Sequence, residues 1–228
     1  MADVAVLLSG GLDSAVLVAR EAAAREVQPL YVSAGLAWES EELALVERLL
    51  RSSAYARRVA PLARLAVDVG DVYPRTHWAI RGTPPAYDTP DEDVYLPGRN
   101  VLLLAKAGVY CALHRIPRVA IGPLAGNPFP DATPEFFEAM GRALSAGLAH
   151  PLAVEAPFAA LHKEDVIRLG ASLGVRFELT LSCMNPTAGR HCGLCSKCRE
   201  RRDAFQAAGV EDPTEYVAAS PRIRTSSP

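Results

Sequence analysis

The sequence predicts an α/β fold: a parallel five-stranded sheet with helices on both faces, followed by a small cysteine-rich helical region. Five short apolar segments recur along the chain, at residues 4–8, 29–33, 65–69, 118–122 and 151–154. Stretches with helical spacing separate them, and this alternation is typical of βαβ units with right-handed crossovers. A chain of 228 residues, half of them hydrophobic, can bury such a core as one domain.

The predicted helices occupy the intervals between these strands. The helix over 39–55 has the clearest pattern, because its leucines and Val46 recur on one face. Thr133 followed by Pro134 predicts the start of another helix, since proline is favoured at the first helical position. The remaining predicted helices span 14–26, 100–114 and 161–174.

Between residues 70 and 98 the sequence shows neither an apolar strand segment nor helical spacing. The stretch contains five prolines together with His77, Trp78 and Tyr87. A loop this long inside a compact domain is usually functional or disordered, and the aromatic side chains argue against disorder. His77 and Trp78 are candidates for a lid, although a lone histidine is more often structural than catalytic. The sequence alone does not assign this loop a role.

Composition excludes several classes of protein. The net charge of −2 argues against a protein whose whole surface is basic enough to bind nucleic acid. No basic and apolar leader opens the chain, and no apolar run reaches the length needed to span a membrane. Four of the five cysteines lie within sixteen residues, which suits a metal site in a reducing compartment. We therefore expect a cytoplasmic protein with no membrane contact.

A glycine pair directly follows the first predicted strand and precedes a helix, in Ser9-Gly10-Gly11-Leu12-Asp13-Ser14. Glycines let several backbone N–H groups converge on one point, and a helix N-terminus adds partial positive charge. A plain surface turn is the alternative, and the surrounding Ser and Asp residues disfavour it. The loop lacks both the lysine of a Walker loop and the Gly-x-Gly-x-x-Gly pattern. We predict a phosphate site, formed by Leu8, Ser9, Gly10, Gly11, Leu12, Asp13 and Ser14.

The topology of such a sheet indicates where the rest of the site lies. Ligands bind beyond the C-terminal ends of parallel strands, at the point where the strand order reverses. The loops after the first, second and fourth strands are then the candidates, at residues 9–14, 34–38 and 122–131.

The cysteine cluster has the spacing of a metal site. Cys183-x₈-Cys192-x₂-Cys195-x₂-Cys198 offers four thiolates, which suits tetrahedral zinc. Free thiols, disulfides and an iron–sulfur cluster are the alternatives. His191 could replace one cysteine, but four cysteines already close the coordination shell, so we predict a structural zinc.

The phosphate loop resembles the PP-loop of the ATP pyrophosphatases, which adenylate a substrate oxygen and release pyrophosphate. This resemblance implies a Rossmann-like fold of the adenine nucleotide alpha hydrolase type, with ATP as co-substrate and Mg²⁺ as cofactor. It also implies that Ser9, Gly10, Gly11 and Ser14 hold the pyrophosphate, while Asp13 assists through Mg²⁺ or braces the loop.

The two motifs together resemble the 7-cyano-7-deazaguanine synthase family. The similarity includes Cys192-Gly193-x-Cys195-x-x-Cys198-Arg199-x-Arg201 and the preceding Glu178-Leu179-Thr180-x-Ser182-Cys183. It also includes Pro97-Gly98-Arg99-Asn100, Pro130-Asp131 followed by Pro134-Glu135-Phe136, and Lys163-x-x-Val166-Ile167-Arg168-Leu169-Gly170. It covers nearly the whole chain in order.

The resemblance implies a ligase that makes 7-cyano-7-deazaguanine (preQ0), a queuosine precursor, from 7-carboxy-7-deazaguanine, ammonia and ATP. It makes Asp13, Lys163 and Arg99 the catalytic candidates, with Arg99, Asn100, Asn127, Phe129 and Asp131 contacting substrate. Lys163 has a solvated first-turn lysine as its alternative. Asp131 could instead cap the helix at Pro134, and Phe129 could anchor its own loop.

Two loops depart from that family's pattern. Residues 34–38 read Ala-Gly-Leu-Ala-Trp where the family usually has Tyr-Gly-Gln-Arg-His, and residues 123–132 are also rewritten. We expect both loops to face the site, which leaves the acceptor open. A paralogue acting on another carboxylate or amide, a tRNA sulfur-transfer enzyme and a non-catalytic zinc-ribbon module are the alternatives.

The predicted organisation has three parts: a nucleotide-binding domain over 1–175, a zinc-binding region over 176–216 and a flexible tail over 217–228. The basic stretch from 190 to 202 favours a solvated charged face over an RNA site. The oligomeric state stays open, with a homodimer among the alternatives.

Overall fold

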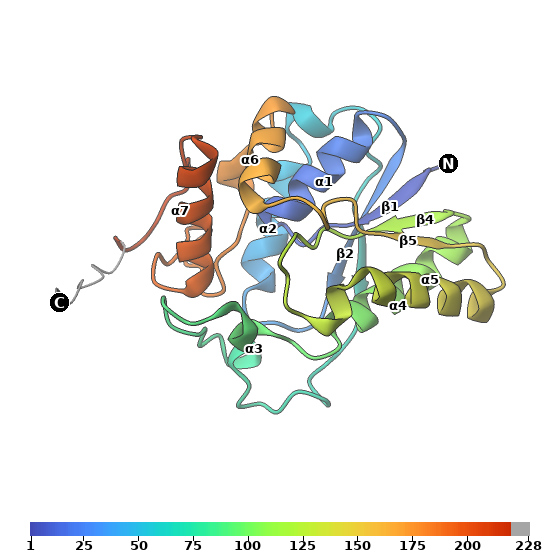
Figure 1. The fold of residues 1–228 in the computed structure, drawn as a ribbon, viewed down its shortest axis with the longest axis horizontal. Helices are drawn as coiled ribbons and strands as arrows, with labels where there is room; N and C mark the ends of the chain where they lie inside the picture. Colours follow the sequence, from blue (N-terminus) through green and yellow to red (C-terminus); the bar gives the residue numbers. More distant parts are fainter. Residues whose placement is uncertain (220–228) are drawn as a thin grey trace.

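The computed structural model describes residues 1–219 and contains a five-stranded sheet in the order β3-β2-β1-β4-β5, with every pair parallel (Figure 1). The predicted parallel sheet is confirmed. The strands are β1 (Val4–Leu7), β2 (Val27–Ser33), β3 (Ala63–Ala66), β4 (Arg118–Ala120) and β5 (Ala153–Glu155). Strand order reverses between β1 and β4, because β1 pairs with β2 on one side and with β4 on the other.

Helices cover both faces of the sheet. The six longer ones are α1 (Leu12–Ala22), α2 (Glu39–Leu49), α4 (Arg99–His114), α5 (Pro134–Leu148), α6 (Lys163–Ser172) and α7 (Ser196–Ala208). The short ones are α3 (Trp78–Arg81) and the 3₁₀ turns η1 (Ser53–Tyr55), η2 (Asp91–Val94), η3 (Pro130–Ala132) and η4 (Phe177–Leu179). One core lies under α1, α2 and α6, and a second lies under α4 and α5. None of the helices within the described residues is long and apolar enough to cross a lipid bilayer.

Strand β1 is buried on both faces, which explains its unbroken apolar sequence. Val4 and Val6 belong to the core under α1, whereas Ala5 and Leu7 belong to the core under α4. All four side chains are less than a tenth exposed. A central parallel strand needs apolar residues on both faces, so its sequence does not alternate.

Several element boundaries differ from the prediction by a few residues. The helix predicted over 39–55 ends at Leu49, where the Ser52 hydroxyl donates to the Leu49 carbonyl at 2.7 Å and the chain turns into η1. The strand predicted at 65–69 ends at Ala66, and Val69 packs into the core from the following loop instead.

The C-terminal region shares the core under α1 and α6. Helix α7 lies beside α6 (Figure 1), and Phe205 meets Phe177 edge-on at 5.3 Å between ring centroids. The division into domains over 1–175 and 176–216 stays a prediction. Of the tail predicted over 217–228, residues 220–228 lie outside the described part of the chain. Val217 and Ala218 hydrogen-bond to the carbonyls of His191 and Cys192, at 2.8 and 3.1 Å.

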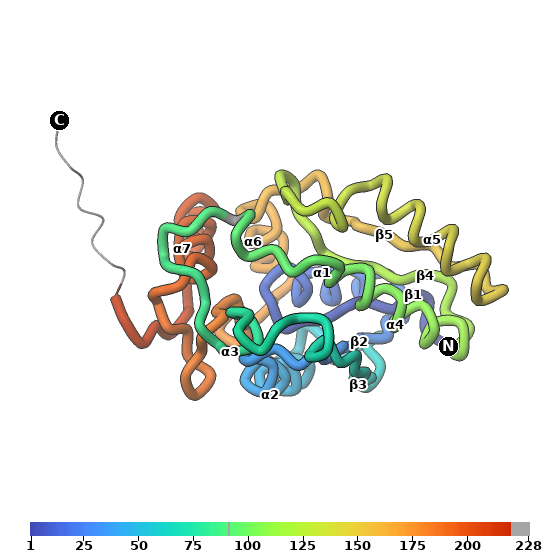
Figure 2. The backbone as a smooth tube through the Cα atoms, turned by 90° about the horizontal axis from the view of Figure 1, so that it is seen from below, coloured from blue at the N-terminus to red at the C-terminus, as the bar shows by residue number. Residues whose placement is uncertain are grey.

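The 70–98 segment is ordered around α3 and η2 rather than irregular throughout. Figure 2 shows it running from β3 past α3 toward α7 and back to the start of α4. Arg199 of α7 donates to the Thr89 carbonyl at 3.2 Å, which holds the segment against the C-terminal region. Tyr73 donates to the Pro97 carbonyl at 2.8 Å and closes the segment on itself.

Candidate active site and cysteine centre

The loop between β1 and α1 is closed by its own serines. The Ser14 hydroxyl donates to the Gly11 carbonyl at 3.0 Å and accepts from the Ser9 amide at 3.2 Å. Gly10 has φ +79°, and a Cβ there would lie 2.8 Å from Val46 Cγ2. Two features therefore favour glycine at this position: the left-handed backbone conformation and the close approach of Val46 on α2.

This loop lines a cavity of about 240 Å³ at the C-terminal ends of the strands. The cavity lies where the strand order reverses between β1 and β4, as the sheet topology predicts. Most of the predicted site residues line it: Leu8, Ser9, Gly11, Asp13, Ser14, Arg99, Asn100, Asn127, Phe129 and Asp131. Gly10 and Leu12 belong to the loop but are not among the lining residues, and neither is Lys163.

Asp131 joins the loop after β4 to the start of α4. Its Oδ2 accepts from the Asn100 amide N–H at 2.9 Å, and the Asn100 side chain donates to the Asp131 carbonyl at 2.9 Å. The alternative that Asp131 caps the helix at Pro134 is wrong, because Thr133 Oγ1 accepts from the Phe136 amide there. Asp131 is 6% exposed, which leaves its carboxylate at the cavity wall.

An aromatic pair forms another wall of the cavity. Phe129 stacks on Tyr95 with ring centroids 4.9 Å apart and 25° between the planes. Tyr95 comes from the 70–98 segment, which also supplies Val94 and Leu96 to the lining. Sequence reasoning missed Tyr95, although its position just before Pro97-Gly98-Arg99-Asn100 was a usable signal.

Two glutamates of α2 also line the cavity, and sequence reasoning missed both. Glu39 accepts from Ser33 Oγ at 2.5 Å and from the Ala34 amide at 2.7 Å, which braces the loop after β2. Glu42 is buried and accepts from the Tyr31 hydroxyl at 2.9 Å. Burial raises the pKa of Glu42 to about 8, against the opposing effect of Arg99. Acidic residues in a first turn are usually solvent-exposed helix caps, so only the fold assigns these two to a cavity.

The loop at 34–38 does not line the cavity, and the expectation that it faces the site is wrong. Leu36 and Trp38 are buried in the core under α1. Trp38 stacks on Trp78 at 5.8 Å with 10° between the rings, and the Ala37 amide donates to the Ala79 carbonyl at 2.9 Å. The rewritten sequence replaces polar side chains by packing against α3. The loop at 123–132 does face the cavity, through Pro123, Asn127, Phe129 and Asp131.

Lys163 is paired and largely buried, which contradicts the alternative of a solvated lysine. It is the first residue of α6, its side chain is 21% exposed, and its Nζ lies 3.4 Å from Asp13 Oδ2. It also forms an ion pair with Glu200 of α7. Burial raises the pKa of Asp13, and Lys163 opposes this rise. The second Asp13 oxygen, Oδ1, is buried without a hydrogen-bond partner among the described residues.

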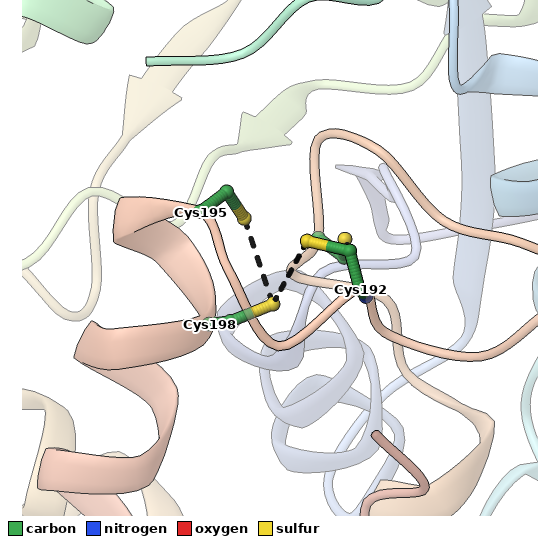
Figure 3. A group of neighbouring side chains, drawn as sticks. Cys192, Cys195 and Cys198 are labelled. Carbon is green, nitrogen blue, oxygen red and sulfur yellow. Dashed lines mark hydrogen bonds between the residues drawn. The ribbon is translucent and has the colours of Figure 1, made fainter. Parts of the chain in front are cut away.

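The four cysteines converge as predicted. Their sulfur atoms all lie within 4.8 Å of one another, so they could hold one metal ion. Cys195 and Cys198 approach to 3.5 Å, and Cys192 and Cys198 to 3.9 Å (Figure 3). Backbone amides of Asn185 and Cys192 donate to Cys183 Sγ at 3.3 and 3.2 Å, which favours a thiolate there.

His191 and Cys111 stay outside this centre. His191 Nε2 accepts from the Ser182 amide at 3.1 Å, and burial together with the charge of Arg201 lowers its pKa to about 3. A neutral, hydrogen-bonded imidazole of this kind supports the loop rather than replacing a cysteine. Cys111 is buried in α4, and burial raises its pKa to about 12, as suits a core thiol.

The arginines of α7 are structural, and the expected solvated face is wrong for two of them. Arg201 is 1% exposed and donates to Thr180 Oγ1 at 2.9 Å and to the Phe177 carbonyl at 2.8 Å. Arg202 donates to the Gly193 carbonyl at 2.9 Å, with its guanidinium 3.8 Å from the Tyr216 ring centroid. Basic residues cluster in this sequence because they tie its loops together.

The fold and site define a Rossmann-like α/β protein that combines a glycine loop at the C-terminal ends of its strands with a four-cysteine centre. A family model described as "Queuosine biosynthesis protein QueC" matches residues 3–209, and the chain belongs to this family. The chain is 36% identical over 222 residues to a 7-cyano-7-deazaguanine synthase of Anaeromyxobacter dehalogenans, covering 93% of this chain and 94% of the relative. It is 34% identical to the synthase of Methanopyrus kandleri, covering 95% and 100%.

A solved structure with a similar path of the backbone is the U34-tRNA thiolase NcsA from Methanococcus maripaludis, described with its [4Fe-4S] cluster. Its TM-score is 0.48 at 13% identity, with coverage of 95% of this chain and 76% of the thiolase. A likeness at this level says nothing about the reaction of the present chain.

Proposed function

We propose that this protein is an ATP-dependent carbon–nitrogen ligase that makes 7-cyano-7-deazaguanine (preQ0) from 7-carboxy-7-deazaguanine and ammonia, in queuosine biosynthesis. One observation carries the proposal: the phosphate loop, Arg99 and the Tyr95–Phe129 pair line a single cavity. Membership of the QueC family and full-length similarity to 7-cyano-7-deazaguanine synthases support it.

The reaction needs two activations, because a carboxylate and an amide are both poor electrophiles. Transfer of AMP to the carboxylate oxygen releases pyrophosphate, and ammonia then displaces AMP to give the amide. A second ATP adenylates the amide oxygen, and loss of AMP with the N–H proton leaves the nitrile. Both adenylations require fixed donors where charge builds on the leaving pyrophosphate.

The phosphate loop provides such donors. In this proposal, backbone N–H groups of residues 9–14 bind the pyrophosphate, together with the positive end of α1. Asp13 fits a role in holding Mg²⁺, since its Oδ1 is buried and has no hydrogen-bond partner among the described residues. Mg²⁺ bound there would neutralise phosphate charge.

Other residues that line the cavity suit a planar acceptor that carries an anion. Arg99 is the cationic lining residue, and its Nε is buried without a partner among the described residues. A guanidinium pairs well with a carboxylate. The Phe129 and Tyr95 rings offer a surface for a fused heterocycle, and Asp131, Asn100 and Asn127 offer polar groups for its edge.

We propose zinc for the cysteine centre. Four sulfurs within 4.8 Å of one another match tetrahedral thiolate coordination. Four protein ligands would close the coordination shell, so the ion would stabilise α7 and the loop before it rather than bind substrate. Metal content of the purified protein, measured by elemental mass spectrometry, tests this assignment.

The activity test combines ATP, Mg²⁺, ammonium and 7-carboxy-7-deazaguanine, with the nitrile detected by mass spectrometry. Asp13→Asn, which keeps the shape of the side chain, is expected to lower the rate by about 100-fold or more. Asp203→Asn, at an exposed site on α7, is the matched control. Absence of nitrile from folded, metal-loaded wild type would overturn the assigned reaction.

A second candidate is a paralogue with the same chemistry and a different carboxylate or amide acceptor. The rewritten loop at 123–132 favours it, because this loop lines the cavity. Formation of AMP and pyrophosphate only with another acceptor would establish it. A tRNA sulfur-transfer enzyme would need a cysteine free to carry sulfur, whereas all four clustered cysteines here point to one metal site.

Homodimer formation and a cytoplasmic location stay predictions. Val101, Val109 and Leu113 are exposed along α4, at 40%, 46% and 78%, and offer apolar surface to a second copy. Light scattering of the purified protein would show whether two copies associate.

A further inference from the structure

We propose that Glu200 is a positioning residue that holds the Lys163 ammonium beside Asp13. The inference rests on the proposed function, since it assigns how Lys163 is placed for ATP chemistry. Glu200 is not among the residues that line the cavity, so it acts through Lys163 rather than on substrate.

Two lysines converge on this one carboxylate. Lys163 pairs with Glu200 Oε1, and Lys197 Nζ lies 2.6 Å from Oε2. Only three of the 24 Lys and Arg residues in the chain are lysine, and the third, Lys106, is exposed on α4. In a chain that otherwise uses arginine, two of the three lysines therefore meet at one point.

The pairing joins two elements that are distant in sequence. Lys163 begins α6, and Glu200 lies on α7, two residues after Cys198 of the cysteine centre. The side chains of Lys163 and Glu200 are 21% and 26% exposed, so water screens their contact only in part. Packing of α7 on α6 thus places the Glu200 carboxylate beside Lys163.

Lys163 needs such a partner. It lies at the N-terminus of α6, where the helix dipole disfavours a cation. Without Glu200, the flexible four-carbon stem of Lys163 would have Asp13, at 3.4 Å, as its one remaining ion-pair partner within residues 1–219. With Glu200 on one side and Asp13 on the other, the ammonium stays next to the loop that we propose binds pyrophosphate. A cation fixed there can stabilise charge on the leaving group without having to be recruited first.

The kinetic test compares Glu200→Gln with wild type at saturating acceptor, with ATP varied and pyrophosphate release measured. Ground-state binding relies on backbone donors, so the KM for ATP is expected to stay within about threefold. Misplacing Lys163 is expected to lower kcat by about 10- to 100-fold. Glu211→Gln, an exposed change just beyond α7, is the matched control and is expected to match wild type. A kcat for Glu200→Gln within twofold of wild type would overturn the proposal.

A second readout does not need turnover. Reductive methylation followed by peptide mass spectrometry reports how accessible each lysine amine is. Lys163 is expected to react at least about fivefold faster in Glu200→Gln than in wild type, because an ion pair restrains the amine. Lys106 is the internal reference, with no change expected. Unchanged Lys163 reactivity would refute the positioning role, whether or not the wild type makes nitrile.

Glu200→Asp keeps the charge and guards against a folding defect in Glu200→Gln. It is expected to fall between wild type and Glu200→Gln in both kcat and Lys163 reactivity. Values no better than those of Glu200→Gln in both readouts would count against the proposal, because the charge alone would then restore nothing. If wild type makes no nitrile while Lys163 becomes reactive in Glu200→Gln, the proposed function fails and the positioning role stands.

Discussion

Gly10 has no room for a side chain. Its φ of +79°, and the 2.8 Å that would separate an added Cβ from Val46 Cγ2, place two separate penalties on any substitution. Gly174 has a similar φ of +72°, but apart from its chain neighbours no atom of the described residues lies within 4 Å of such a Cβ. Gly174 therefore shares only the backbone penalty. This pair of glycines separates backbone strain from steric overlap.

Gly10→Ala is expected to lower the free energy of unfolding by about 1–3 kcal/mol more than Gly174→Ala, because it also displaces α2 from the loop. Urea denaturation of the two variants measures the difference. Gly10→Ala is also expected to weaken ATP binding, measured by calorimetry. Equal stability and ATP affinity in both variants would show that the loop tolerates the overlap.

Glu42 makes stability depend on pH. Its pKa is raised by burial to about 8 from an ordinary value of 4.5, so the folded state keeps a proton that the unfolded state has lost. This contribution is therefore full below pH 4.5 and is lost as the pH rises through about 8. The largest slope from one such group is about 1.4 kcal/mol per pH unit.

Glu42→Gln removes this titratable carboxyl group. Wild type is expected to lose stability from about pH 5.5 to 8, whereas the variant should show a shallower decline over the same range, by roughly the slope of one group. Urea denaturation at four pH values measures both curves. Parallel curves would mean that Glu42 is ionised in the folded protein throughout.

At the scale of elements, α7 depends on the cysteine centre. The helix begins at Ser196, directly after Cys195, and Cys198 lies in its first turn. Glu200 and Arg199 follow in the next positions and reach Lys163 and the Thr89 carbonyl. If the cysteines hold a metal, its loss is therefore expected to disturb the Lys163 contact beside the phosphate loop and the contact with the 70–98 segment.

Cys198→Ser is expected to lose bound metal and to lower the melting temperature by roughly 5 °C or more, because a structural metal site contributes folding energy directly. Elemental analysis and calorimetry measure the two effects. Cys111→Ala, in the core of α4, is the control: it is expected to keep the metal while losing some packing energy. Full metal content in Cys198→Ser would contradict the four-cysteine assignment.

The 70–98 segment contributes Tyr95 to the cavity wall. Tyr95→Ala is expected to raise the KM for the acceptor by about tenfold, since stacking on a base contributes about 1–3 kcal/mol. The KM for ATP should not change. Tyr95→Phe keeps the ring and should behave as wild type, so a defect in it would assign the role to the hydroxyl instead.

At the scale of the whole molecule, local signals predicted the features that depend on neighbouring residues. The apolar run of β1, the glycine loop and the four cysteines were each predictable, because each depends on residues that are close together in the sequence. The roles of Tyr31, Glu42 and Glu200 were not predictable. Strand order places the first two at the cavity, and the packing of α7 on α6 places Glu200 beside Lys163. The 34–38 loop was misassigned because Trp38 finds its partner forty residues later, at Trp78.

That tryptophan pair has a spectroscopic consequence. The chain contains two tryptophans, and they are Trp38 and Trp78, stacked at 5.8 Å. Far-ultraviolet circular dichroism of closely packed indoles gives an exciton-coupled band that neither ring shows alone. Trp78→Phe should abolish this band. The band would therefore report, without an added label, whether the 70–98 segment stays packed on the loop after β2.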